Sequence, residues 1–253
     1  MVVKRQSDIK RLFSYSWEFY KNKLNYIIAF SIPLFVAWII LIAVQAPTYT
    51  AVGAPHLRTG SIPDLTENPF DILIIIIGYV LAAVIVAETI VNLNLLIKSK
   101  RMLTNPSTEI RAGLGKYAFS ITAFLVVLFL ISAVAQLLTF ERFGQSVVYP
   151  FIVFVSSFFL FFTIPAIVID DEDMFSAIRH SIDLAKRKPM LIFSWVVFAT
   201  ILLTFLGLIF VQSNIIPEPF SSFIFIALHV LFISPFLLIL QTQMYVEKYP
   251  LAK

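Results

Sequence analysis

The chain has 253 residues, of which 59% are hydrophobic and 13% are charged, whereas soluble domains contain about 25% charged residues. This composition excludes an ordinary soluble domain and predicts an integral membrane protein. The formal net charge of +4 could suggest nucleic acid as a partner, but the basic residues form short clusters at the ends of apolar runs. We therefore expect membrane lipids, and no nucleic acid, as partners.

Six apolar runs are long enough to cross about 30 Å of hydrocarbon as helices. They cover residues 24–44, 72–97, 117–140, 147–169, 190–211 and 220–244. The first run follows a charged segment and is long enough to span, so we expect no cleaved signal peptide. The sequence predicts an all-α fold: a polytopic membrane helical bundle with six transmembrane helices, in one domain of residues 1–253.

Lysine and arginine residues are distributed unevenly between the two sides of this predicted bundle. Of the 19 in the chain, only Arg58 and Arg142 lie in the first, third and fifth connections. The others lie in the N-terminal segment, the second and fourth connections and the C-terminal tail. Because basic loops stay in the cytoplasm, we expect a multi-pass protein of the cell membrane with both termini cytoplasmic.

Residues 173–188 lie between two apolar runs and have the pattern of an amphipathic helix. Asp173 is a favourable N-cap residue. At helical spacing the segment divides into an apolar and a polar face. The apolar face is Met174, Ile178, Ile182 and Ala185, and the polar face is Arg179, Asp183, Lys186 and Arg187. This pattern predicts a helix that lies flat among the cytoplasmic head groups.

A similar pattern lies 165 positions earlier, in residues 8–23. There Asp8, Ser16, Glu18, Lys21 and Lys23 align with Asp173, Ser181, Asp183, Lys186 and Lys188, and Ile9, Phe13, Trp17 and Tyr20 align with the apolar face. A weaker middle copy begins at the N-cap Asn105 and Pro106. We expect three repeat units, residues 8–97, 105–169 and 173–245, each a surface helix followed by a two-helix hairpin. The alternative is that loops before spanning helices generally attract basic and amphipathic residues.

One part of the chain resembles a known family. The residues concerned are Pro165, Ala166, Ile167 and Val168, acidic Asp171 and Glu172, then Ala177, Ile178, Arg179, Ser181 and Leu184. Together they resemble the six-helix membrane domain fused to some glycerophosphodiester phosphodiesterases, which also occurs alone in bacterial and archaeal membrane proteins. The resemblance implies a membrane architecture and a connection with lipids. It carries over no catalytic residue, because the soluble phosphodiesterase barrel is absent.

Three polar residues within the predicted spans form a candidate intramembrane site. Glu88 is an acid well inside a span, Asn92 follows one helical turn later, and His229 lies in the last span. Ionisable residues in membranes often mark proton or substrate paths. The alternative is that Glu88 is a neutral, hydrogen-bonded acid that fixes helix packing, and that His229 is structural.

No metal, cofactor or catalytic site is expected. The run Asp170, Asp171, Glu172 and Asp173 could bind a cation, but acids at a helix N-terminus are explained more simply by the helix dipole. The chain has no nucleotide-binding glycine motif or hydrolase elbow. We therefore expect a non-enzymatic protein that binds, organises or moves lipids or other amphiphiles. It could act with a membrane-protein partner or without one. The alternative is a small transporter or channel subunit that uses Glu88.

Basic residues next to the predicted surface helices are the candidate contacts of lipid head groups. They are Lys21, Lys23, Arg111, Arg179, Lys186, Arg187 and Lys188.

Overall fold

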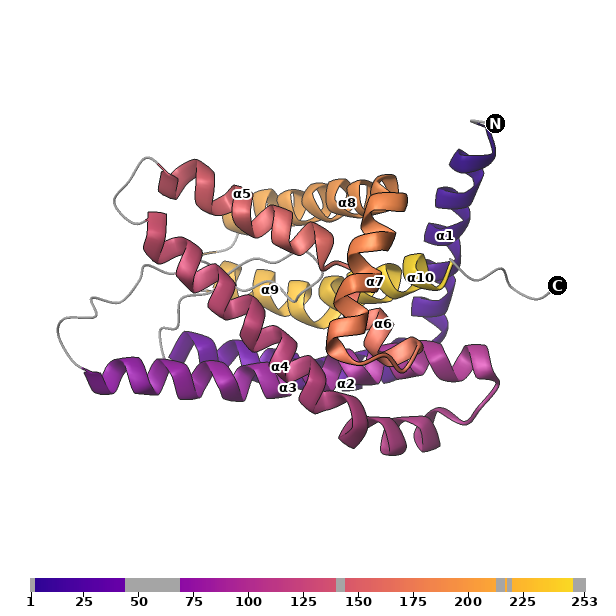
Figure 1. Ribbon diagram of the computed structural model, residues 1–253, viewed down its shortest axis with the longest axis horizontal. Coiled ribbons are helices and arrows are strands. Elements are labelled where there is room, and N and C mark those ends of the chain that lie inside the picture. Colours follow the sequence, from indigo (N-terminus) through magenta and orange to yellow (C-terminus); the bar gives the residue numbers. More distant parts are fainter. Residues whose placement is uncertain (1–2, 44–68, 140–143, 213–216, 218–219, 248–253) are drawn as a thin grey trace.

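The computed structural model describes residues 3–43, 69–139, 144–212, 217 and 220–247, and these residues are helical apart from short connections (Figure 1). The helices are α1 (Val3–Asn22), α2 (Leu24–Ala43), α3 (Pro69–Met102), α4 (Pro106–Thr139), α5 (Gly144–Phe159), α6 (Thr163–Ile169), α7 (Met174–Arg187), α8 (Pro189–Gly207), α9 (Phe220–Leu228) and α10 (Ser234–Val246). Two π-helical segments, η1 (Leu208–Gln212) and η2 (His229–Ile233), extend α8 and join α9 to α10.

Several helical stretches have the length and apolar composition of a membrane span. Five qualify by themselves: Ile76–Met102, Pro106–Ile131, Val148–Ile169, Pro189–Phe210 and Phe223–Val246. A sixth qualifies only when Leu24–Ile40 of α2 is taken together with Lys10–Asn22 of α1, and these two helices are bent by 86° relative to one another. The described chain therefore has the helices of a multi-pass membrane protein, five or six in number.

The outer surface of α8 is apolar along its whole length. Phe193, Val197, Ile201 and Phe205 follow one another at four-residue spacing, and between 46% and 65% of each is exposed. Soluble proteins rarely leave so large an apolar surface uncovered, whereas the outer face of a spanning helix contacts lipid chains. This stripe is consistent with the membrane bundle predicted from composition.

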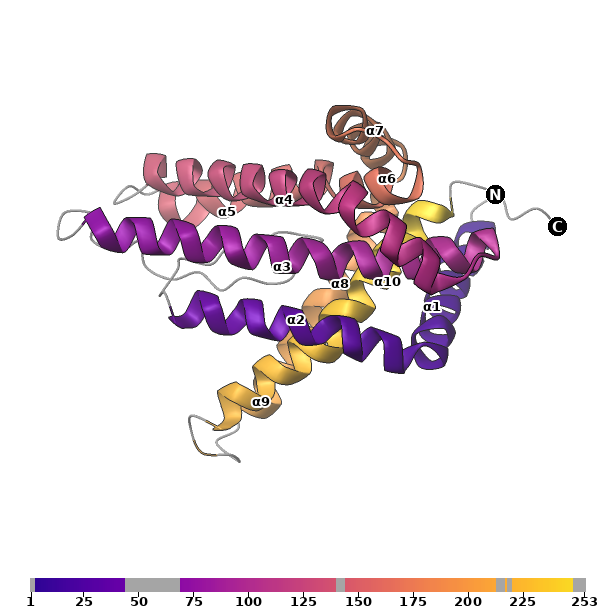
Figure 2. The same ribbon diagram turned by 90° about the horizontal axis from the view of Figure 1, so that it is seen from below.

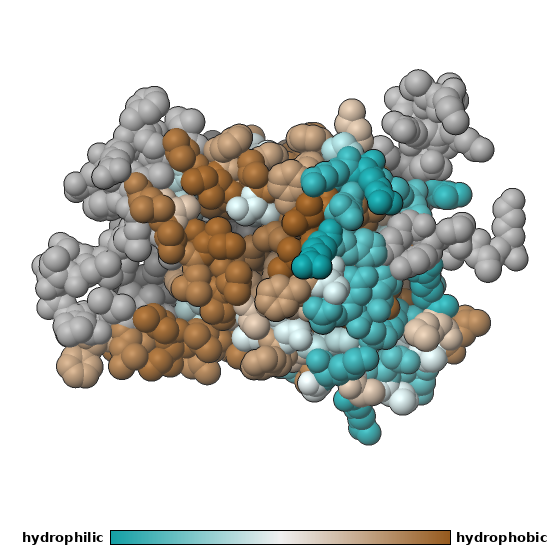
Figure 3. Space-filling view, viewed as in Figure 1, coloured by the Kyte–Doolittle hydropathy of each residue, from teal (hydrophilic) through white to brown (hydrophobic). Residues whose placement is uncertain are grey.

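Polar and apolar surfaces occupy different ends of the molecule (Figure 3). Hydrophilic residues gather where α7 and the connection between α3 and α4 lie, and hydrophobic residues cover the face formed by α4, α5 and α8. The start of α1 and the end of α10 lie at the hydrophilic end (Figures 1 and 2). The helix α1 crosses this end at a steep angle to the long helices, so a flat position among head groups is geometrically available to it.

The helix α10 is the centre of the bundle. All of its 13 residues are buried, and it packs against α1, α3, α6 and α8. Two of its polar side chains bond to neighbouring segments: Thr242 donates to Asn94 Oδ1 of α3 at 2.8 Å, and Gln241 donates to the carbonyl of Phe161, between α5 and α6. Lipid offers no hydrogen-bond partners, so these contacts are required for polar residues at such a position.

The middle surface helix predicted from Asn105 onward is not a separate helix. Asn105 does cap α4, since its Oδ1 accepts from the Ser107 N–H at 3.1 Å, but α4 then continues without interruption to Thr139. Gly113 has no Cβ atom, and a Cβ atom placed there would lie only 2.5 Å from Leu95 Cδ1 of α3. The missing side chain at Gly113 allows the first part of α4 to pack closely against α3.

The predicted span of residues 147–169 is also divided. The helix α5 ends at Phe159 and α6 begins at Thr163. Ser181 of α7 fills the break: its hydroxyl donates to the Phe159 carbonyl at 2.7 Å and accepts from the Phe162 N–H at 2.9 Å. Pro165 stands in the first turn of α6, where a missing N–H does not cost a hydrogen bond.

The buried faces of α1 and α7 are rotated from the predicted ones. On α1 the buried residues include Leu12, Ser16, Phe19 and Tyr20, whereas Trp17, predicted on the apolar face, is 50% exposed. On α7 they are Ala177, Ser181, Leu184 and Ala185. Small and hydroxyl-bearing residues allow helices to pack closely. A prediction from hydrophobicity alone underestimates their tendency to be buried. The predicted polar face of α7 is exposed.

Candidate functional site

The four acidic residues Asp170 to Asp173 make the turn between α6 and α7. Asp170 ends α6 with its N–H bonded to the Ala166 carbonyl at 3.2 Å. Asp171 then adopts a left-handed backbone with φ of 60°, a conformation that aspartate and asparagine tolerate better than most residues. Asp173 is extended and begins α7. The turn folds α7 back against α6, and we call Asp170–Asp173 with its partners the acidic junction.

Asp171 joins the turn of the acidic junction to two helices, α3 and α4. Its carboxylate lies 3.2 Å from Lys98 Nζ of α3 and 2.8 Å from Lys116 Nζ of α4, and it accepts a hydrogen bond from the Tyr117 hydroxyl. Partial burial acts to raise the pKa of Asp171, but the hydrogen bonds from Lys116, Tyr117 and Lys98 outweigh this effect and lower it to about 2. The residue is therefore ionised near neutral pH.

Sequence reasoning did not identify the partners of Asp171, and the buried partner Lys98 is the clearest case. We counted it among the loop residues after a span ending at residue 97, but it is a buried residue of α3 and also donates to the Val168 carbonyl at 2.8 Å. A signal was present: Lys98 follows Asn94 by one helical turn, on the face that the structure buries.

Asp173 has the structural role expected from its position. Its carboxylate accepts from the N–H groups of Phe175 and Ser176 at 3.0 and 3.2 Å and from the Ser176 hydroxyl at 2.5 Å. The Ser176 hydroxyl, followed by the backbone donors, lowers the pKa of Asp173. Asp173 is the N-cap of α7, as predicted.

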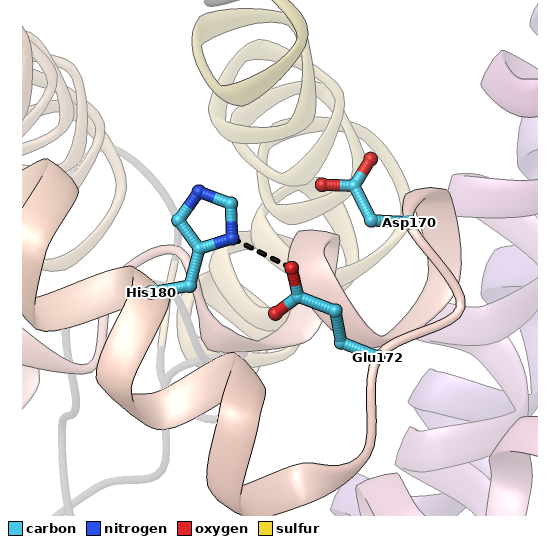
Figure 4. Close-up of side chains that lie close together, drawn as sticks. All are labelled: Asp170, Glu172 and His180. Carbon is cyan, nitrogen blue, oxygen red and sulfur yellow. Dashed lines mark hydrogen bonds and ion pairs between the residues drawn. The ribbon is translucent and has the colours of Figure 1, made fainter.

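The other two acids of the junction face a histidine (Figure 4). His180, two turns along α7, places Nδ1 2.7 Å from Glu172 Oε1, and the Tyr245 hydroxyl of α10 donates to Asp170. The candidate ligand atoms of Asp170, Glu172 and His180 all lie within 4.8 Å of one another. His180 lies within the helix predicted over residues 173–188, and the turn at Asp171 brings it to the acids.

The predicted intramembrane residues lie at two different places in the bundle. Glu88 is half-buried on α3, and Asn92 is buried one turn further along. His229 is buried at the start of η2, where its ring lies 6.0 Å from that of Phe225. The segment η2 packs mainly against α2, α9 and α10, whereas α3 packs mainly against α2, α4, α6 and α10. His229 and Glu88 thus lie on segments that share the neighbours α2 and α10 but do not pack extensively against one another.

The candidate head-group residues lie on or beside the predicted surface segments. Arg179, Lys186 and Arg187 are exposed on α7, Arg111 is exposed on α4, and Lys188 is half-buried at the turn into α8. On α1, Lys21 Nζ lies 5.8 Å from the centre of the Trp17 ring. Lys23 Nζ lies 5.7 Å from that of Tyr26. Such cation–π pairs contribute about 0.5–1 kcal/mol at exposed sites.

Comparison with known proteins gives no relative: the chain matches no protein-family model, no curated protein and no solved structure. The resemblance to the six-helix membrane domain remains a prediction from sequence. Function is therefore argued from the chain's own residues.

Proposed function

We propose that the chain is a non-enzymatic integral membrane protein that binds and organises lipids or other amphiphiles at one membrane surface. The observation that carries this proposal is the surface of α7. Arg179, Lys186 and Arg187 are exposed beside Phe175, which is 70% exposed. A helix that offers basic groups together with a bulky apolar side chain suits the boundary between head groups and acyl chains.

The helix α1 supports the same proposal, because it joins α2 as α7 joins α8. The α1–α2 break lies at Lys23 and the α7–α8 break at Lys188, 165 positions apart. At each break the lysine N–H bonds to the carbonyl four residues earlier: Phe19 at 3.1 Å and Leu184 at 2.8 Å. We propose that these are corresponding parts of repeat units and that both helices present lysines to the cytoplasmic leaflet.

Lipid binding by the purified protein tests the proposal directly. The α7 face predicts a preference for anionic lipid, since each basic residue near a charged membrane contributes about 1 kcal/mol. Native mass spectrometry should find more phosphatidylglycerol than phosphatidylcholine bound from equal mixtures. The triple variant Arg179→Gln, Lys186→Gln and Arg187→Gln should reduce retained phosphatidylglycerol about tenfold or more.

The matched control keeps the charge: Arg179→Lys with Arg187→Lys should retain most of the phosphatidylglycerol. Equal binding of both lipids by the native chain, or unchanged binding by the glutamine variant, would contradict a head-group role for this face.

A transporter or channel subunit is the second candidate, and one observation favours it. Asn92 Oδ1 is buried without a hydrogen-bond partner among the described residues, and half-buried Glu88 lies one turn away. Buried polar atoms without protein partners suit a site that receives water, a proton or a substrate. A proton flux in liposomes that Glu88→Gln abolishes, with folding preserved, would support this candidate.

A further inference from the structure

The acidic junction contains a group of side chains that neither lipid binding nor helix capping uses. Of its four acids, Asp171 is paired with Lys98 and Lys116, and Asp173 caps α7. Asp170 and Glu172 instead face His180 (Figure 4). The acidic run thus contains two residues with structural roles, Asp171 and Asp173, and two whose carboxylates lie near the imidazole of His180.

We propose that Asp170, Glu172 and His180 bind a divalent first-row transition metal ion, with Zn²⁺ as the reference case. Each residue offers one ligand atom, and the three atoms lie within 4.8 Å of one another. They come from the end of α6, the turn and the second turn of α7. The proposal is independent of lipid binding by the basic face of α7.

A second observation points to a ligand at this place. Glu172 Oε1 is paired with His180 Nδ1, but Glu172 Oε2 is shielded from solvent and has no hydrogen-bond partner among the described residues. A carboxylate oxygen removed from water is normally satisfied by a donor or a cation. A metal ion bound by Glu172 would supply that partner.

The donor set also selects the class of metal. Two carboxylates and one imidazole match Zn²⁺, Mn²⁺ or Fe²⁺, whereas Ca²⁺ and Mg²⁺ prefer oxygen ligands only. Zn²⁺ bonds of about 2.0–2.1 Å place tetrahedral ligand atoms about 3.3 Å apart. The 4.8 Å spread therefore requires side-chain movements of about 1.5 Å, which rotations about side-chain bonds can supply.

The arrangement leaves coordination positions open. Three protein ligands fill three of the four positions that Zn²⁺ usually has, and the remaining position takes water or another small oxygen ligand. The Tyr245 hydroxyl bonded to Asp170 would orient that carboxylate, as outer-shell hydrogen bonds do in known metal sites.

Cobalt titration of the chelator-treated, purified full chain tests the proposal. We expect one Co²⁺ per chain with visible absorption of four- or five-coordinate cobalt, and displacement of Co²⁺ by Zn²⁺. His180→Gln and Glu172→Gln should each weaken Co²⁺ binding about 100-fold or more, because even outer-shell changes cost 10- to 100-fold.

Two control variants separate this site from other metal-binding groups. His229→Gln removes the histidine of η2, and Asp183→Asn removes an exposed carboxylate of α7; both should bind Co²⁺ as the native chain does. X-ray absorption of the Zn²⁺-loaded native protein should show one imidazole among oxygen ligands, which holds even if a ligand variant fails to fold. No stoichiometric Co²⁺ binding, no imidazole ligand, or unchanged binding by folded His180→Gln would overturn the proposal.

Discussion

At the scale of single residues, Asp171 is the acid of the acidic junction that the lysines of α3 and α4 approach. Asp171→Asn removes the negative charge that Lys98 and Lys116 approach, while asparagine still accepts the left-handed backbone. Because Lys98 is buried, its amine would then face an uncharged and weaker partner. With Asp171 itself 46% exposed and partly screened by water, we expect a loss of about 1–2 kcal/mol in the free energy of unfolding.

Chemical unfolding in detergent micelles measures this difference. Asp183→Asn on the exposed face of α7 is the control and should stay within about 0.5 kcal/mol of the native chain. Equal stability of Asp171→Asn and the native protein would show that Asp171 contributes little.

Asp171 also predicts how the stability of the protein depends on pH. Its pKa of about 2 in the folded protein lies below its ordinary value of 3.8, so its contribution is complete above about pH 4 and is lost as the pH falls towards 2. Unfolding of the native chain, followed in a chelating buffer, should become easier across this window. Asp171→Asn should show a shallower decrease; an identical pH profile of the two proteins would contradict the assignment.

At the scale of elements, Ser181 predicts how the break between α5 and α6 is held. Ser181→Ala leaves the Phe159 carbonyl and the Phe162 N–H without the partners they have now. Because Ser181 is fully buried, we expect a loss of about 2–4 kcal/mol in the free energy of unfolding.

The corresponding serine of α1 provides a matched control. Ser16 is equally buried, but its hydroxyl has no hydrogen-bond partner among the described residues. Ser16→Ala should therefore leave stability unchanged or raise it slightly. If both alanine variants lose the same stability, packing volume and not the two hydrogen bonds explains the effect.

Whether a structural feature could be predicted depends on how local its sequence signal is. Long apolar runs predicted the helices that can span, because length and composition are properties of the segment itself. The break at residues 160–162 was missed, since it depends on Ser181 about 20 residues later. Likewise, the meeting of His180 with Glu172 follows the left-handed turn at Asp171, and Tyr245 of the distant α10 lies beside both His180 and Asp170. Such contacts are decided by tertiary packing and leave little trace in hydrophobic periodicity.

At the scale of the whole molecule, the position of charges predicts the orientation. Ser176→Cys places a thiol on exposed α7, at the hydrophilic end, and it should not react with an impermeant reagent in intact cells if that end is cytoplasmic. Cysteines replacing Ser61 and Ser213, which lie outside the described residues, should react. Labelling of Ser176→Cys in intact cells would reverse the predicted orientation.

The burial of α10 has a consequence for biosynthesis. This helix follows every other described helix along the chain, yet it fills the centre of the bundle. A ribosome makes the chain from its N-terminus, so the earlier helices enter the membrane before their common packing partner exists. Until α10 is made, Asn94 and the Phe161 carbonyl lack the side chains that later bond to them, although α2, α3 and α4 can already pack against one another. We expect the bundle to close only when α10 arrives, and the nascent protein to be more exposed to quality-control proteases until then.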